Sequence, residues 1–230
     1  MRSFFYRINL KLFIYILVLF SVQITAQKEI YKEIFYQNQE IDIQLLDVDL
    51  VEVMHTDEQK IAITVQDYAE NPTLLKIEEN KRIITITTSL TAPFQSQVKT
   101  EKYCYVQPLY PTFKIMIPKG CTITITYNKG NFKAINFDGN LNLSLDIGDV
   151  KIDNFIGKVN TEMLSGNMSV TIVNTTIDVQ SNTGKIQTNF PTTNWIKTET
   201  SLKGVSGKNT NTLKVLSINA NITLNSATTQ

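Results

Sequence analysis

Glycine recurs at every ninth position through the second half of the chain. The residues on this grid are Gly130, Gly139, Gly148, Gly157, Gly166 and Gly184, and Thr175 occupies the one grid point without glycine. Two and four places after each grid point the residue is apolar, apart from two threonines, whereas the odd places are polar apart from Ile135. Strict alternation of this kind gives a strand one buried and one wet face. The chain is therefore predicted to be all-β, with a strand in each unit and a glycine at each corner.

A second period, of 18 residues, overlies the first. Residues 132–139 (FKAINFDG) match residues 150–157 (VKIDNFIG) in their Lys, Asn, Phe and Gly. If each turn of the chain contained two strands, equivalent residues of successive turns would lie one above the other and would repeat every 18 positions. We therefore expect a right-handed β-solenoid built from nine-residue strand units, with about two strands per 18-residue coil and two facing sheets. A hairpin meander or a sandwich is the alternative, but hairpins prefer two-residue turns such as Asn-Gly, and these corners are mostly single glycines.

The segments that flank the repeat also have strand character. Short alternating runs at residues 41–43, 50–53, 61–65, 75–77 and 83–87 predict N-terminal strands. Prolines make residues 89–112 a loop or joint, after which Phe113–Pro118 leads into the repeat. Within Leu213–Leu224, residues 220–224 resemble a last repeat with Ala220 at its corner, and this segment is expected to help cap the open edge of the solenoid. The expected organisation is a signal peptide at 1–26, a β-strand region at 27–112 with its Pro- and Tyr-containing loop near 89–112, and solenoid repeats with a C-terminal cap at 113–230. Residues 27–230 are expected to form one continuous domain.

The first 26 residues read as a cleavable signal peptide. Arg2, Arg7 and Lys11 form a positive region, and Leu12–Phe20 is an unbroken apolar run of nine residues. Such a run is short for a membrane span, which needs about 20 apolar residues. Cleavage after Ala26 would leave Gln27 as the first residue of an exported protein, in the periplasm, on the outer surface or secreted. After that cleavage the sequence predicts no stable transmembrane segment.

The net charge and the cysteine and histidine content limit the kinds of ligand that the chain is expected to bind. Without residues 1–26 the chain has 19 basic and 21 acidic residues, so it carries no basic footprint for nucleic acid. The two cysteines, Cys104 and Cys121, could form a disulfide in an oxidising compartment or could stay as two thiols. One histidine, His55, and no second cysteine pair give no metal signature. No cofactor is expected.

The order of these features resembles a known family. Short strands come first, then a strand that ends in Ile117-Pro118, then strands that each open with Gly. This order is similar to that of the bacterial putative-adhesin family of β-solenoid domains, a domain of unknown function, over residues 40–225. The resemblance implies a β-solenoid exposed outside the cytoplasm, and it brings no catalytic residues. Thr175 and Ala220 depart from the family's glycine corners.

Two groups of residues are candidates for chemistry or binding, whereas the pattern disfavours calcium binding. Calcium-binding β-rolls also repeat every nine residues, but they carry more glycine and a fixed Asp, which this chain lacks. Asp149 and Asp153, with Asp178, could present paired carboxylates on one outward face, although solvated decoration is the simpler interpretation. Tyr103, Tyr105 and Tyr110 lie around the proline-rich loop, where they could contact a partner or pack against the solenoid.

Export, a regular fold and the family resemblance favour a non-enzymatic adhesin-like protein of the bacterial cell envelope or surface. Its role would be structural, or it would bind a glycan or an envelope or surface protein. One alternative is a periplasmic accessory or sensor subunit that docks on a membrane partner through residues 89–112. The other is a carbohydrate-active enzyme that uses the face of Asp149 and Asp153.

Overall fold

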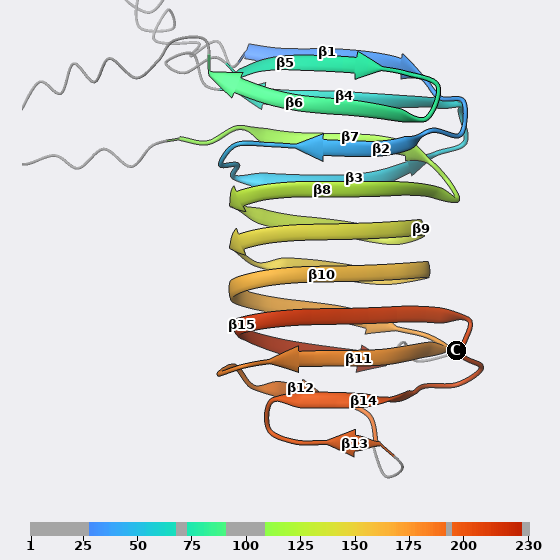
Figure 1. Cartoon of the computed structure of the whole chain (residues 1–230), viewed down its shortest axis with the longest axis vertical. Coiled ribbons are helices and arrows are strands. Elements are labelled where there is room, and N and C mark those ends of the chain that lie inside the picture. The colour runs from blue at the N-terminus through green and yellow to red at the C-terminus, as the bar shows by residue number, and fades with distance from the viewer. Residues whose placement is uncertain (1–27, 68–72, 91–108, 192–194, 227–230) are drawn as a thin grey trace, which may run out of the picture.

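The computed structural model describes residues 28–67, 73–90, 109–191 and 195–226, and all regular secondary structure within them is β-strand. The prediction of an all-β chain is confirmed for these residues. Figure 1 shows the strands stacked one above another, with the N-terminal strands at one end and the C-terminal strands toward the other.

Fifteen strands form one large sheet that is not closed on itself. Their bounds are β1 (Lys28–Phe35), β2 (Glu40–Gln44), β3 (Leu50–Thr56), β4 (Lys60–Asp67), β5 (Thr73–Glu79), β6 (Ile83–Leu90), β7 (Thr112–Pro118), β8 (Cys121–Lys129), β9 (Asn131–Ile147), β10 (Val150–Ile172), β11 (Thr175–Ser181), β12 (Ile186–Thr188), β13 (Ile196–Lys197), β14 (Ser201–Val205) and β15 (Asn211–Ser226).

The sheet folds into two layers. In Figure 1 the front layer contains β5, β6, β2, β8, the second half of β9, the middle segment of β10 (158–165), the first half of β15, β11, β14 and β13. The rear layer contains β1, β4, β7, β3, the first half of β9, the two outer segments of β10, the second half of β15 and β12. We call the outward surfaces of these layers the front face and the rear face. The apolar side chains of both layers fill the space between them.

The 18-residue period is visible as the register of the central strands. Phe132 of β9 pairs with Val150 of β10, and Asn140 pairs with Lys158, all in parallel. The same offset joins Ile123 of β8 to Leu141 of β9. Because parallel pairing at this offset aligns equivalent positions, like side chains stack along the sheet. The bounds of the strands differ from the expected nine-residue units, since β9 and β10 continue through Gly139, Gly157 and Gly166 without a break.

Close packing of successive turns explains the glycine grid. At Gly166, φ is 139°, and a Cβ there would lie 1.9 Å from the carbonyl oxygen of Gly148. At Gly157, φ is 105°, and a Cβ would lie 2.2 Å from the carbonyl oxygen of Gly139. These corners thus need both a left-handed backbone and the absence of a side chain. At Gly148, Gly157 and Gly166 the close approach is to the glycine corner of the previous turn, 18 residues earlier. Gly184 differs, because its φ is not left-handed and the atom it approaches belongs to Ala220.

The core forms a continuous column between the layers. The inward positions of β9 and β10 are almost fully buried, as at Leu141, Ile152 and Val159. β-Branched and other apolar residues at alternate positions suit this packing, since successive side chains of a strand point to opposite faces. Thr161 is a polar exception, because its hydroxyl is buried and has no hydrogen-bond partner among the described residues.

The C-terminal strand does not lie at the edge where the sequence placed it. β15 is inserted between β10 and β11: Val159 of β10 pairs with Leu213, and Leu213 pairs in turn with Ile177 of β11, both in parallel. The expectation that Leu213–Leu224 covers the open edge is therefore not met. The last positions of the front layer are taken by β14 and β13, which run antiparallel to their neighbours.

Insertion also occurs toward the N-terminal end. β3 lies between β7 and the first half of β9, parallel to both, although it precedes them by some 60 to 80 positions in the chain. β2 lies between β6 and β8, again in parallel. Strands that are distant in sequence from their partners are thus inserted within the stack near both of its ends.

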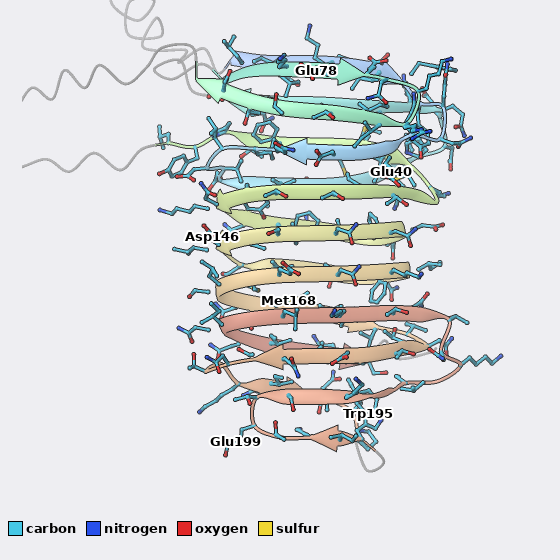
Figure 2. All side chains as sticks on the ribbon, in the orientation of Figure 1. Glu40, Glu78, Asp146, Met168, Trp195 and Glu199 are labelled. Carbon is cyan, nitrogen blue, oxygen red and sulfur yellow. The ribbon has the colours of Figure 1, made fainter. Side chains whose placement is uncertain are left out.

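An aromatic cluster lies near the C-terminal end of the stack. The indole of Trp195 packs against Gly204, where a Cβ would lie only 2.4 Å from a ring atom. Phe190 lies beside it, with ring centroids 5.4 Å apart. Figure 2 shows Trp195 close to β14, away from the central strands. These rings cover apolar surface at the last turn of the stack.

Candidate binding face

A hollow of about 470 Å³ lies on the front face, across β8, β9, β10 and β15. Most of its lining residues are of polar type, and several of them, such as Thr124, Asn142 and Asn160, occupy equivalent outward positions of adjacent strands. Leu143 and Thr161 line it from buried positions. The lining residues are Thr124, Asn142, Leu143, Ser144, Asn160, Thr161, Glu162, Lys214 and Leu216. The 18-residue register aligns Asn142 with Asn160, and the insertion of β15 places Lys214 next to Asn160.

A second hollow, of about 330 Å³, continues the first along the same strands. Ser144, Glu162 and Leu216 line both hollows. The second hollow also contacts Leu164 and Ile218, whose side chains are largely exposed. We call the two hollows together the front groove. Figure 2 labels Asp146, a residue of the second hollow, at the margin of the front layer. The front groove is therefore polar at one end and partly apolar at the other.

Hydrogen bonds between stacked side chains order the polar end. Asn160 donates from Nδ2 to Oδ1 of Asn142 at 2.9 Å, and Asn142 donates to the hydroxyl of Thr124 at 3.4 Å. A primary amide has two N–H donors and a carbonyl acceptor, so one bond per step leaves further capacity for a ligand. The side chains are held in place before any ligand arrives, which lowers the entropy cost of binding.

Asp149 belongs to a second row of stacked polar residues that are joined by hydrogen bonds, and we call such a row a ladder. Its Oδ1 accepts hydrogen bonds from the backbone N–H and the side-chain amide of Asn167, at 3.0 and 2.9 Å. Its own backbone N–H donates to Oδ1 of Asn131 at 3.1 Å. Asn221 of β15 extends the ladder by donating to Asn167 at 3.3 Å. The carboxylate thus bonds to side chains and backbone one turn away in the stack.

The other predicted carboxylates lie in ion pairs. Asp153 is 3.1 Å from the ammonium of Lys151 on its own strand. Asp178 of β11 accepts a hydrogen bond from Lys203 of β14 at 3.0 Å, across an antiparallel pair. Neither contact brings a second carboxylate into position for acid and base chemistry. No group of three metal-ligating side chains occurs among residues 28–67, 73–90, 109–191 and 195–226.

His55 links three strands. Its Nε2 accepts a hydrogen bond from the backbone N–H of Asp138 at 2.6 Å, and its Nδ1 lies 3.3 Å from the carbonyl oxygen of Ile117. Its ring is 5.3 Å from that of Phe137. No role was predicted for this histidine, and no signal in the sequence shows that β3, β7 and β9 meet there.

Of the three predicted partner-binding tyrosines, only Tyr110 lies among the described residues. It is half-buried, and the ammonium of Lys129 lies 5.5 Å from its ring centroid, within the range of a cation–π contact. Tyr103 and Tyr105 lie outside the described residues, so their predicted contact with a partner stays a prediction.

Of the two cysteines, too, only one lies among the described residues. Cys121 is buried, with only 2% of its surface exposed, and this burial raises the pKa of its thiol to about 11. It forms no disulfide within the part of the chain that the structure describes. Cys104 lies outside that part, so the predicted pairing is still a prediction. The predicted signal peptide also lies outside the described residues.

No helix that is long and apolar enough to cross a membrane occurs in the described segments.

Neither a family profile nor a curated protein matches this sequence. Solved structures do match. A "putative cell adhesion protein" from Clostridium sporogenes superposes with a TM-score of 0.59 and 18% identity, covering 87% of this chain and 100% of that one. A "putative adhesin" from Bacteroides fragilis has a TM-score of 0.36 and 12% identity, covering 88% and 99% of the two chains. A "putative adhesin" from Parabacteroides distasonis has a TM-score of 0.24 and 10% identity, covering 87% and 98%.

The first of these likenesses shows a shared fold, and the two lower scores add nothing to it. All three neighbours carry the names of adhesion proteins rather than of enzymes. The predicted all-β class and the predicted likeness to adhesion proteins agree with the first of these structures, whereas the handedness of the solenoid and its nine-residue units stay predictions. The front groove was not predicted, because Lys214 and Leu216 are far from Asn142 and Asn160 in the chain. The one signal available was the repeated polar residue at equivalent places of the nine-residue units.

Proposed function

We propose that this chain is an exported, non-enzymatic, adhesin-like protein of the bacterial cell envelope or surface, and that its front groove binds a glycan or protein partner. The observation that carries this proposal is the elongated groove of ordered amide, hydroxyl and charged side chains on adjacent strands. Amide and hydroxyl groups suit the hydroxyls of a sugar, and the exposed leucine and isoleucine at the other end suit an apolar face of the partner.

Further support comes from the neighbour of the same fold. The protein from Clostridium sporogenes is named for cell adhesion, and this chain covers its whole length. We also propose the finer features of the fold: a right-handed solenoid with two nine-residue units per turn, over residues 113–230 with the strands of 27–112 attached. Export would follow cleavage after Ala26, and N-terminal sequencing of the exported protein should then give Gln27.

A glycan array probed with residues 27–230 tests the function directly. Specific binding is expected, and the double variant Asn142→Ala/Asn160→Ala should lower the apparent affinity at least tenfold, because both ladder amides are removed. The matched control is Asn128→Ala, an exposed asparagine of β8 that lines neither hollow. Melting temperatures of the variants separate lost binding from lost folding.

The possible outcomes test the location of the binding site and the adhesive function separately. Equal binding by the double variant would place the ligand outside the front groove. No binding to the array, to intact cells or to envelope extracts would remove the adhesive function. In that case the alternative is an accessory or sensor subunit that docks through residues 89–112, which include Tyr110. Co-purification of envelope proteins with the wild type and with Tyr110→Ala would test this alternative.

A further inference from the structure

We call the space that β15 occupies, between β10 on one side and β11 and β12 on the other, the slot. The strands on its two sides are related by the same offset as strands that pair directly elsewhere in the stack. Residues of β11 and β12 follow those of β10 by 18 positions, as in Val159 and Ile177 or Met168 and Ile186. This is the offset at which β9 and β10 pair directly. Nothing in the repeat therefore requires a strand between β10 and β11, yet β15 separates them along its whole length.

The contacts that hold β15 in the slot are those that any strand with alternating apolar residues would make. Backbone ladders run along both of its sides, to β10 on one and to β11 and β12 on the other. Its inward residues Leu213, Val215, Ala220, Ile222 and Leu224 are completely buried. In addition, the hydroxyl of Ser181 donates to the carbonyl oxygen of Ala220 at 2.8 Å. None of these contacts depends on whether β15 belongs to the same chain.

The segment that connects β14 to β15 is short, and it crosses the chain at Asn174. Residues 206–210 lead from β14 across Asn174 to the start of β15. Asn174 accepts hydrogen bonds from the backbone N–H of Lys208 at its side chain (3.0 Å) and from those of Thr210 (2.8 Å) and Asn211 (3.0 Å) at its carbonyl oxygen. Asn174 has a φ of 49° and directly precedes Thr175, the grid point without glycine. The place where the glycine grid is interrupted is therefore the place where the chain skips the level that β15 fills.

We propose that this slot is a strand-acceptor site and that it takes β15 of a second copy of the chain, so that two copies associate by exchanging their C-terminal strands. β15 follows β10, β11 and β12 in the chain, so the slot and the strand are formed by separate segments that must find each other. Exchange of an identical element preserves every contact inside the slot and changes only the path of residues 206–210. A short connection between an element and its own site favours such exchange. Occupation by a second copy increases with protein concentration because it is bimolecular.

Cysteine cross-linking between two differently substituted copies tests this proposal. Ser169 of β10 pairs with Thr223 of β15, and adjacent strands place paired Cα atoms within the range that a disulfide spans. One sample of residues 27–230 carries Ser169→Cys and the other carries Thr223→Cys. They are mixed, incubated at rising concentration and oxidised, and the dimer band is checked by mass spectrometry for a bond between the two introduced cysteines. The control mixture pairs Thr223→Cys with Ser144→Cys, a residue of the front layer that does not neighbour Thr223.

Strand exchange predicts at least fivefold more of the specific disulfide in the test mixture than in the control, with a yield that rises with concentration. Asn174→Ala should raise that yield at least threefold, because it removes the side-chain bond to Lys208. Asn154→Ala should leave it unchanged, since Asn154 has a similar φ of 65° but bonds to Asn136 instead. A test mixture no different from the control would refute exchange if the double variant S169C/T223C closes its disulfide within one chain. Failure of that internal disulfide would contradict the placement of β15 in the slot itself.

Discussion

At the residue scale, the distance between one corner and the corner of the previous turn decides which positions tolerate a side chain. Gly166→Ala would place a Cβ 1.9 Å from a carbonyl oxygen in a left-handed backbone, so it should lower the free energy of unfolding by about 3 kcal/mol or more. Gly120→Ala is the matched control, because φ is 75° there but no atom lies within 4 Å. It should cost about 1 kcal/mol. Urea unfolding measures both, and equal losses would show that packing against the previous turn is unimportant.

The buried thiol of Cys121 gives a prediction about pH. Its pKa of about 11 in the folded protein lies above the value of about 9 for an exposed thiol. Between these values the unfolded chain loses the proton while the folded chain keeps it, so stability falls as pH rises. In a Cys104→Ser background, the free energy of unfolding should drop between pH 9 and pH 11 by at most about 2 kcal/mol. Urea titrations across this range, compared with the same background carrying Cys121→Ala, isolate the effect. Equal slopes for the two proteins would contradict it.

At the element scale, His55 joins β3 to β9 and lies against the carbonyl of Ile117 in β7. His55→Ala leaves the N–H of Asp138 without its acceptor and removes a ring contact with Phe137, so it should cost about 1–3 kcal/mol of stability. Lys119→Ala is a suitable control, because it breaks only an exposed ion pair with Asp57 near the same end of β3. Its effect should be much smaller. A loss no larger for His55→Ala than for the control in thermal unfolding would show that this junction does not depend on the imidazole.

At the scale of the whole molecule, the fold behaves as a stack in which each strand contacts chiefly its neighbours. β10 pairs with β9 on one side and with β15 on the other along most of its length, whereas β13 pairs only with β14 among the described strands. In such stacks local opening starts at the ends. Hydrogen exchange should therefore be slowest in the amides of β10 and fastest in β13. Equal protection of the two strands would indicate all-or-none opening of the stack.

Much of this architecture follows from local patterns in the sequence. The alternation of polar and apolar residues sets which side chains of β9 and β10 face the core. The glycine grid sets where the chain turns, and the 18-residue echo sets the parallel register of β8, β9 and β10, including the stacking of Asn142 on Asn160. These features are predictable because they involve segments that follow one another in the chain at a fixed spacing.

The candidate site was predictable only in part. Polar residues at equivalent places implied an ordered outer face, but the front groove also needs Lys214 and Leu216, which belong to β15. The carboxylate of Asp149 was a candidate for catalysis by its type and spacing, whereas in the structure it lies in a ladder with Asn131 and Asn167. A residue's type and spacing do not reveal its partner when that partner comes from another turn.

The sequence by itself determined that the chain is β-structured, where its central strands turn and how consecutive turns align, because these depend on side-chain alternation and on backbone space at each corner. Only the tertiary structure decided that β3 enters the stack between β7 and β9, and that β15 separates β10 from β11. A repeat specifies what kind of strand fits at each level but not which segment of the chain fills it. That choice depends on burying the apolar faces of all strands at once and on the path of the connecting segments.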